Sequence, residues 1–261
     1  MNTNKNICVL IINSNDITTV DSLRGQTFED FECFLMNNSV EQINHYIEND
    51  QRFHITDKTD VEQILKQTNC KYVIITDSSN VFIPTALEYI NRMIDLTDAD
   101  IINFNVKPLN DTNIPKHQKP SFNYICSKKR ILEHFADELS CFCIKKDILL
   151  DICDFSLNHF VVLGALKKAK DMTTTIQTYV LEKQTNDTDY KKIVNNFVMN
   201  EKDFSFNFWK NYFGYFIPII VNYTIKNNDR DTFIYCCKNI PLKLIPLKYK
   251  FIFFIMRITN K

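Results

Sequence analysis

The chain has 261 residues and 45% hydrophobic composition, so it is long enough to bury a sizeable core. Its 31 basic and 31 acidic residues cancel, which argues against a generic polyanion binder. Three isolated glycines and no G-x-S-x-G segment argue against P-loop phosphotransfer, Rossmann oxidoreduction and α/β-hydrolase chemistry.

Apolar strand-like runs alternate with short amphipathic segments over the first hundred or so residues. Strands are predicted at residues 7–13, 31–37, 52–56, 71–77 and 99–106. Helices are predicted at residues 18–25, 39–50, 60–69 and 85–96. This alternation is typical of a mostly parallel sheet with helices on both faces.

The pattern is less regular further along the chain. Residues 107–125 contain three prolines and predict a loop. A helix at 127–139, an apolar segment with a helical turn at 141–152, a helix at 158–171 and a strand at 173–182 are predicted next. We expect an α/β domain over residues 1–195 and a helical extension over 196–261.

The extension is aromatic and basic. From Asn196 onward there are ten basic and four acidic residues, so this end carries +6 and the preceding 195 residues carry −6. The aromatic run 204–225 is interrupted by asparagines and Pro218, which favours a helix buried against the domain or against another subunit over a membrane span. The last twenty residues are interpreted either as a basic amphipathic segment at a membrane surface or as a terminal helix docked on the core.

Nine cysteines form an odd set without C-x-x-C spacing, and most lie in apolar runs, which predicts buried thiols. Cys141 and Cys143 share a strand face, but no His or Cys completes a zinc ligand set. The N-terminus has no long apolar signal segment, so we expect a reducing, cytoplasmic setting.

Five segments in order resemble family 2 glycosyltransferases with the GT-A fold. They are "LIINSND" (10–16), "SLRGQTFEDFECFLMNNSVEQ" (22–42), "CKYVIITDSSNVFIPTALEYI" (70–90), "ADIINFNV" (99–106) and the stretch 140–183 that begins "SCFCIKKD". The resemblance covers residues 7–182. It implies a Rossmann-like, mostly parallel sheet covered by helices, followed here by the helical, aromatic-rich and basic extension.

The resemblance also implies a chemistry. Such enzymes use a nucleotide-sugar donor whose leaving diphosphate is neutralised by Mg²⁺ or Mn²⁺, held by acids one residue apart at a strand end. Another acid reads the nucleotide, and a further acid takes the proton of the acceptor hydroxyl. The positions that match are nucleotide-sugar contacts at Asn37, Asn38 and Asp77, metal ligands at Asp77, Ser79 and Asn80, and a base at His159.

At these positions the sequence departs from the family pattern. Asn37 and Asn38 replace the acids after the second strand, and Ser79 and Asn80 leave Asp77 as the one acid of the metal motif. His159 stands where the base is expected, and the glycine and arginine before the 60–69 helix are missing. The alternatives without a chemical role are that Asp77 is an acid of the turn near the 85–96 helix and that His159 is a polar residue at the start of a helix.

Two functions therefore remain. The first is a catalytically impaired glycosyltransferase-like subunit or scaffold for cell-surface polysaccharide or teichoic acid type glycosylation, without a resident cofactor. Residues 204–261 would then contact an active transferase partner, a second copy or the inner face of the membrane. The alternative is an active metal-assisted transferase with atypical residues. A nucleic-acid-binding module is disfavoured by the neutral total charge and the acidic main domain.

Overall fold

A computed structural model of the chain describes residues 6–12, 16–36, 41–56, 61–78, 80–108, 142–152, 164–166, 168–182, 190–200, 202 and 206–259. The described residues fall into two compact units, the first ending at Glu182 and the second beginning at Tyr190.

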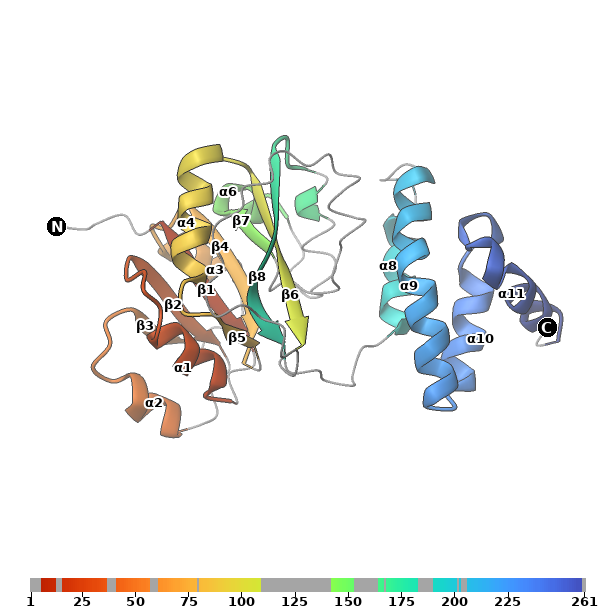
Figure 1. Cartoon of the computed structure of the whole chain (residues 1–261), viewed down its shortest axis with the longest axis horizontal. Coiled ribbons are helices and arrows are strands. Elements are labelled where there is room, and N and C mark those ends of the chain that lie inside the picture. Colours follow the sequence, from red (N-terminus) through yellow and green to blue (C-terminus); the bar gives the residue numbers. More distant parts are fainter. Residues whose placement is uncertain are drawn as a thin grey trace. The chain divides into compact units, whose positions relative to one another are not determined.

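A mixed sheet forms the centre of the first unit (Figure 1), with the strand order β3-β2-β1-β4-β7-β6-β8-β5. β1 pairs in parallel with β2 and β4, β2 pairs in parallel with β3, and β6 pairs in parallel with β8. β7 is antiparallel to β4 and β6, and β5 is antiparallel to β8. The mostly parallel α/β sheet predicted from the sequence is confirmed. The strands are Ile7–Ile12 (β1), Phe31–Met36 (β2), Phe53–Thr56 (β3), Tyr72–Asp77 (β4), Asn80–Phe82 (β5), Ile101–Pro108 (β6), Phe142–Lys145 (β7) and Met172–Glu182 (β8).

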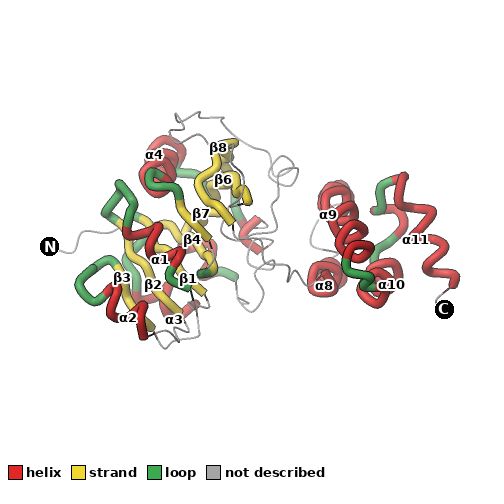
Figure 2. Tube along the Cα trace, turned by 60° about the horizontal axis from the view of Figure 1, so that its bottom comes forward, coloured by secondary structure: helices red, strands yellow, loops and turns green. Residues whose placement is uncertain are grey.

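Helices cover both faces of this sheet (Figures 1 and 2). One face carries the neighbouring helices α1 (Thr18–Arg24), α2 (Glu41–Ile47) and α4 (Ala86–Thr97). The other carries α3 (Val61–Gln67) and α6 (Lys146–Leu150). The first five residues of β1 are fully buried, which explains why this strand reads as a continuous apolar run rather than an alternating one.

The second unit is helical. Its elements are α8 (Tyr190–Asn200), α9 (Phe206–Lys226), α10 (Arg230–Asn239), the short 3₁₀ helix η3 (Leu242–Leu244) and α11 (Leu247–Thr259). Its core is aromatic, since the ring of Phe197 meets Trp209 and Phe213 edge-on at 5.0 and 5.1 Å. From Phe206 onward the aromatic run is therefore helical, and one side of this helix is buried within the helical unit. Among the described helices, none combines the length and the apolar composition needed to cross a bilayer.

Three described elements differ from the sequence prediction. The turn expected after residue 77 contains the strand β5, whose partner β8 lies far along the chain. α8 and α10 were not predicted as separate helices, although α10 lies within the helical extension expected at 196–261. In the structure α10 packs against α8, α9 and α11, and Phe197 of α8 packs against Trp209 of α9. The helix predicted at 127–139 lies outside the described residues, as does most of that predicted at 158–171.

The cysteines in the described part of the chain are buried free thiols, as predicted. Burial raises the pKa of Cys33, and it raises the pKa of Cys236 and of Cys237 to about 12. These thiols stay protonated at neutral pH and pack as small apolar groups.

Candidate functional site

The parallel strands β1 to β4 end at one edge of the sheet. Ile12 at the end of β1 lies opposite Asp77 at the end of β4, and Met36 lies opposite Thr56 at the ends of β2 and β3. Ligands of open α/β sheets bind outside the carboxyl ends of the strands. Asp77 therefore occupies the edge at which a donor site is expected.

The turn that follows Asp77 is held by two threonine hydroxyls. Thr19 of α1 is fully buried, and its Oγ1 donates to the backbone oxygens of Asn80 at 2.6 Å and Asp77 at 3.0 Å. Thr76 Oγ1 donates to the Asp77 oxygen at 3.4 Å and accepts from Asn80 Nδ2 at 3.0 Å. Side chains from α1 and β4 thus fix the backbone of the turn.

The Asn80 side chain is part of this support. Asn80 is 2% exposed, its amide nitrogen is bonded to Thr76, and its Oδ1 has no hydrogen-bond partner among the described residues. An unpaired buried carbonyl oxygen can accept one further donor or contact a cation. Asp77, by contrast, is half-buried at the strand end.

These ligands provide little charge for a divalent cation. Mg²⁺ and Mn²⁺ favour several hard oxygen ligands, including carboxylates. Asp77 carries the one carboxylate of this turn, Asn80 contributes a neutral oxygen, and no group of three His, Cys, Asp or Glu within the described residues could hold an ion. The described residues do not fit a resident metal ion by themselves.

A glutamine links the elements around the turn. Gln26 Nε2 donates to the backbone oxygens of Ser22 at 3.0 Å and Ile83 at 2.8 Å, and Gln26 Oε1 accepts from the Leu87 amide at 3.0 Å. The last bond satisfies one of the free amides at the start of α4. Because Gln26 is 6% exposed, these bonds are made away from water and hold α1 against α4.

The start of α1 has its own support. Asp16 Oδ1 accepts from the Thr18 amide at 2.9 Å and from Thr18 Oγ1 at 2.6 Å. Such side-chain bonds two residues ahead form a local turn that directs the chain from β1 into the helix.

Of the site residues predicted from the sequence, the structure brings Asp77 and Asn80 together in one turn. Asn37, Asn38, Ser79 and His159 lie outside the described residues, so their roles remain predictions. Sequence reasoning missed three supporting residues, of which Thr76 alone stands in an apolar run of the sequence. They are Thr19, Gln26 and Thr76.

A hollow of about 610 Å³ lies elsewhere, along the end of α2 and β3, and shares no lining residue with the Asp77 turn. Asp50 on its wall accepts from Nε and Nη2 of Arg52 at 2.9 and 2.7 Å. The hydrogen bonds from Arg52 hold the pKa of Asp50 below its usual range, although burial acts in the opposite direction. This acid is committed to an ion pair.

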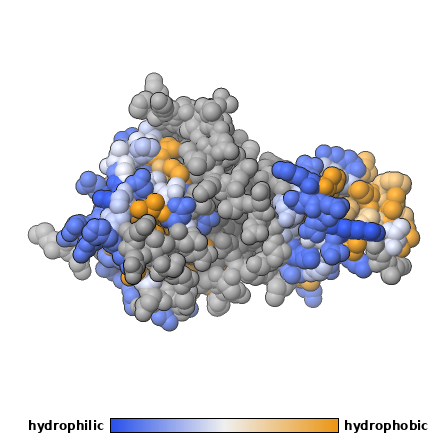
Figure 3. Space-filling model, turned by 90° about the horizontal axis from the view of Figure 1, so that it is seen from below, coloured by the Kyte–Doolittle hydropathy of each residue, from blue (hydrophilic) through white to orange (hydrophobic). Residues whose placement is uncertain are grey.

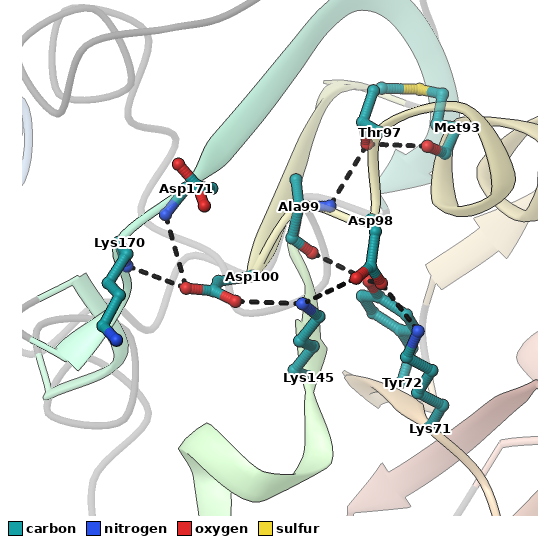
Figure 4. Close-up of polar contacts among 10 residues, drawn as sticks. All are labelled: Lys71, Tyr72, Met93, Thr97, Asp98, Ala99, Asp100, Lys145, Lys170 and Asp171. Atoms are coloured by element: carbon teal, nitrogen blue, oxygen red, sulfur yellow. Dashed lines mark hydrogen bonds and ion pairs between the residues drawn. The ribbon is translucent and has the colours of Figure 1, made fainter.

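A charged cluster lies at the opposite edge of the sheet, where β4 and β6 begin (Figure 4). Lys145 Nζ lies 3.1 Å from Asp100 and 3.5 Å from Asp98, which also accepts from Lys71 at 2.6 Å. Burial and the neighbouring Asp98 raise the pKa of Tyr72, whose hydroxyl is bonded to the backbone oxygen of Ala99 at 2.9 Å. These groups join the strand starts and lie away from the candidate site.

No protein-family model matches the chain, and no curated protein matches it by sequence. Among solved structures, the chain is similar to S. aureus TarS. The crystal structure of TarS 1–349 has a TM-score of 0.67 and 12% identity, over 98% of this chain and 88% of that one. TarS 1–349 in complex with UDP-GlcNAc has a TM-score of 0.67 and 14% identity, over 98% of this chain and 88% of that one. The longer TarS structure has a TM-score of 0.66 and 14% identity, over 98% of this chain and 53% of that one.

TarS is a family 2 glycosyltransferase with a GT-A fold. This chain has the GT-A fold. The fold class expected from the sequence is therefore confirmed. At 12–14% identity the likeness establishes the fold and leaves the activity open. Within the GT-A fold of this chain, the Asp77 turn follows the strand that pairs with β1, where the resemblance predicted the degenerate metal motif.

Proposed function

We propose that the chain is a family 2 glycosyltransferase-like protein that has kept the GT-A scaffold and whose transfer chemistry is impaired. It acts as a non-catalytic subunit or scaffold in cell-surface polysaccharide or teichoic acid type glycosylation, on the cytoplasmic side. The observation that carries this proposal is the Asp77 turn, which offers a single carboxylate beside the buried, Thr76-bonded side chain of Asn80.

The physical argument concerns the charge of the donor. Transfer of a sugar from a nucleoside diphosphate leaves negative charge on the diphosphate, which must be stabilised as the bond breaks. Neutral Ser and Asn oxygens bind a divalent cation more weakly than carboxylates do. Asn80 is also engaged in supporting the turn, so Asp77 is the main charged group that this turn can offer.

The biological setting rests on the structural neighbours. TarS is a teichoic acid glycosyltransferase, and one of its solved structures contains UDP-GlcNAc. UDP-GlcNAc is therefore the first donor to test with this chain. Partner proteins in this setting would be active transferases that contact residues 204–261.

An active transferase is the second candidate, and one observation favours it. Asp77 is retained at the carboxyl edge of the sheet, and the Asn80 Oδ1 beside it has no partner among the described residues. In this reading Asp77, Ser79 and Asn80 would hold Mg²⁺ or Mn²⁺ together with the donor, Asn37 and Asn38 would contact the nucleotide, and His159 would serve as the base.

Calorimetric titration with UDP-GlcNAc and Mn²⁺ separates the two readings. Wild type is expected to bind weakly. Ser79→Asp places a second acid two residues after Asp77 and is expected to bind at least about tenfold more tightly. Gln63→Glu adds an equal charge on the exposed side of α3 and should bind like wild type. Equal affinities for wild type and Ser79→Asp would contradict an impaired metal motif.

Turnover is measured in parallel with UDP-, GDP- and CDP-linked donors, and the release of the nucleotide belonging to each donor is followed separately. The proposal expects no release above a protein-free control. Metal-dependent release by wild type that disappears in Asp77→Ala and persists in Asp231→Ala, an acid of α10, would establish the active transferase instead.

A further inference from the structure

The C-terminal helix α11 has two apolar sides, and one of them is docked. Phe253 is fully buried and packs edge-on against Phe233 of α10 with ring centroids 5.5 Å apart. Arg257 donates from Nε to the backbone oxygen of Cys237 and from Nη2 to that of Ile240. Since these oxygens belong to the end of α10, Arg257 satisfies carbonyls that the helix itself leaves unpaired. The docked side sets the rotation of α11 about its axis.

The other side of α11 is an apolar stripe open to solvent. Its residues are 84% (Leu247), 74% (Phe251), 50% (Phe254), 40% (Ile255) and 55% (Ile258) exposed. Their spacing of i, i+4, i+7, i+8 and i+11 places them within an arc of about 100° on the helix surface. Figure 3 shows hydrophobic residues gathered at the part of the molecule where Figure 1 places α11. Large exposed apolar groups in a continuous stripe mark an interaction surface.

The charges beside the stripe are all positive. From Lys238 to the last residue the sequence contains six Lys or Arg and no Asp or Glu. At the helical repeat, Lys248 and Lys250 lie on either side of the arc that contains the stripe. Lys248 is exposed, and its Nζ lies 4.8 Å from the ring centroid of Tyr249.

The apolar stripe and the lysines beside it together indicate the chemistry of the partner that binds to α11. A second copy that docked its own α11 on this stripe would bring two basic helices together, which is unfavourable because neither copy has an acid from Lys238 onward to pair with them. An apolar protein groove would match the stripe but not the lysines. A bilayer with anionic headgroups matches both, because acyl chains accept the apolar groups and headgroup phosphates attract Lys and Arg.

We propose that α11 binds to the surface of an anionic lipid bilayer and lies in its plane. Leu247, Phe251, Phe254, Ile255 and Ile258 enter the boundary between headgroups and acyl chains, and Lys248 and Lys250 contact the phosphates. Phe253 and Arg257 remain on α10, so the helical unit binds without unfolding. This proposal does not depend on whether the first unit binds or transfers a sugar.

Flotation of the full chain with lipid vesicles tests the proposal. The vesicles are phosphatidylcholine mixed with phosphatidylglycerol, and phosphatidylcholine alone as the uncharged reference. Wild type is expected to float with the anionic vesicles and to remain behind with the uncharged ones. The double variant F251S/F254S should partition about a hundredfold less, at about tenfold for each phenylalanine removed from the bilayer. K248E/K250E should lose at least about fivefold per lysine on the anionic vesicles.

The matched control is I55S/L96S, which removes two exposed apolar side chains of β3 and α4. It should float like wild type. Circular dichroism spectra and melting temperatures of all variants should match those of wild type, which would show that the substitutions leave the fold intact. Failure of wild type to float, or flotation of F251S/F254S equal to that of wild type, would overturn the proposal. A concentration-dependent dimer in lipid-free buffer that F251S/F254S abolishes, with no flotation of wild type, would assign the stripe to a second copy and overturn it as well.

Discussion

The buried hydroxyl of Thr19 donates a hydrogen bond of 2.6 Å to the backbone oxygen of Asn80. The same hydroxyl lies 3.0 Å from the backbone oxygen of Asp77, so one side chain of α1 holds both ends of the turn after β4. This contact supports the backbone of the turn from within the protein. Under the proposed function, it would keep the geometry of the turn although Asp77 is its one carboxylate.

Replacing Thr19 with Val should test this support. The change keeps the shape of the side chain and removes the hydroxyl donor from the Asn80 oxygen and from the Asp77 oxygen, which still accepts from Thr76, so the free energy of unfolding should fall by about 1–3 kcal/mol. Urea denaturation measures the loss. Thr224→Val is the control. The Thr224 hydroxyl bonds to the Ile220 oxygen of its own helix, and that oxygen keeps its backbone hydrogen bond when the hydroxyl is removed. If Thr224→Val lowers the free energy of unfolding as much as Thr19→Val does, the proposed role of Thr19 in supporting the turn is contradicted.

Gln26→Leu should weaken the contact between α1 and α4. The substitution keeps most of the side-chain volume and removes the bonds to the Ile83 oxygen and the Leu87 amide, so a loss of about 1–3 kcal/mol in the free energy of unfolding is expected. Hydrogen exchange should show a selective loss of protection at the Leu87 amide. Gln67→Leu, at the exposed end of α3, should change stability by no more than about 0.5 kcal/mol. Unchanged protection at Leu87 would contradict this role.

Asp100 should make stability depend on pH. Burial raises its pKa, but hydrogen bonds from the amides of Lys170 and Asp171 and from Lys145 outweigh burial and lower the pKa overall. A carboxyl whose folded pKa lies below its unfolded value of about 3.9 stabilises the fold above that value and loses this contribution as the pH falls through the folded pKa.

Asp100→Asn should therefore lower the free energy of unfolding by about 1.5–3 kcal/mol at neutral pH, the range for hydrogen bonds to a charged group. The difference from wild type should shrink as the pH falls below about 4. Denaturation at a series of pH values measures it, and Asp95→Asn on the exposed side of α4 provides the control with little change. A difference that stays constant with pH would show that the Asp100 charge is not involved.

Two glycines should respond in opposite ways to alanine. A Cβ at Gly214, inside α9, would meet no atom within 4 Å, so Gly214→Ala should raise the free energy of unfolding by about 0.5–1 kcal/mol through helix propensity. A Cβ at Gly164 would lie 3.0 Å from Cγ2 of Ile152, so Gly164→Ala should destabilise by about 1–3 kcal/mol through overpacking. Melting curves compare the two, and a stabilised Gly164→Ala would show that Ile152 moves aside at little cost.

The sequence by itself determined the strands that form the centre of the sheet and the strand end at which Asp77 lies. These features are local, because a run such as Tyr72–Asp77 shows its burial in its own composition. The aromatic helix α9 was foreseen for the same reason. The departures from the metal motif that the family resemblance predicts were equally visible, since they are a matter of residue type.

The tertiary structure alone decided how these parts support one another. β5 forms only because Asn80–Phe82 pairs with the distant β8, and the Asp77 turn is held by Thr19 of another element. Such contacts join residues far apart in sequence, and local periodicity carries no signal for them. The same holds for α11, which has apolar residues on two sides. From the sequence, docking on the protein and contact with a membrane were alternatives, whereas the fold docks Phe253 on α10 and leaves Phe251 exposed.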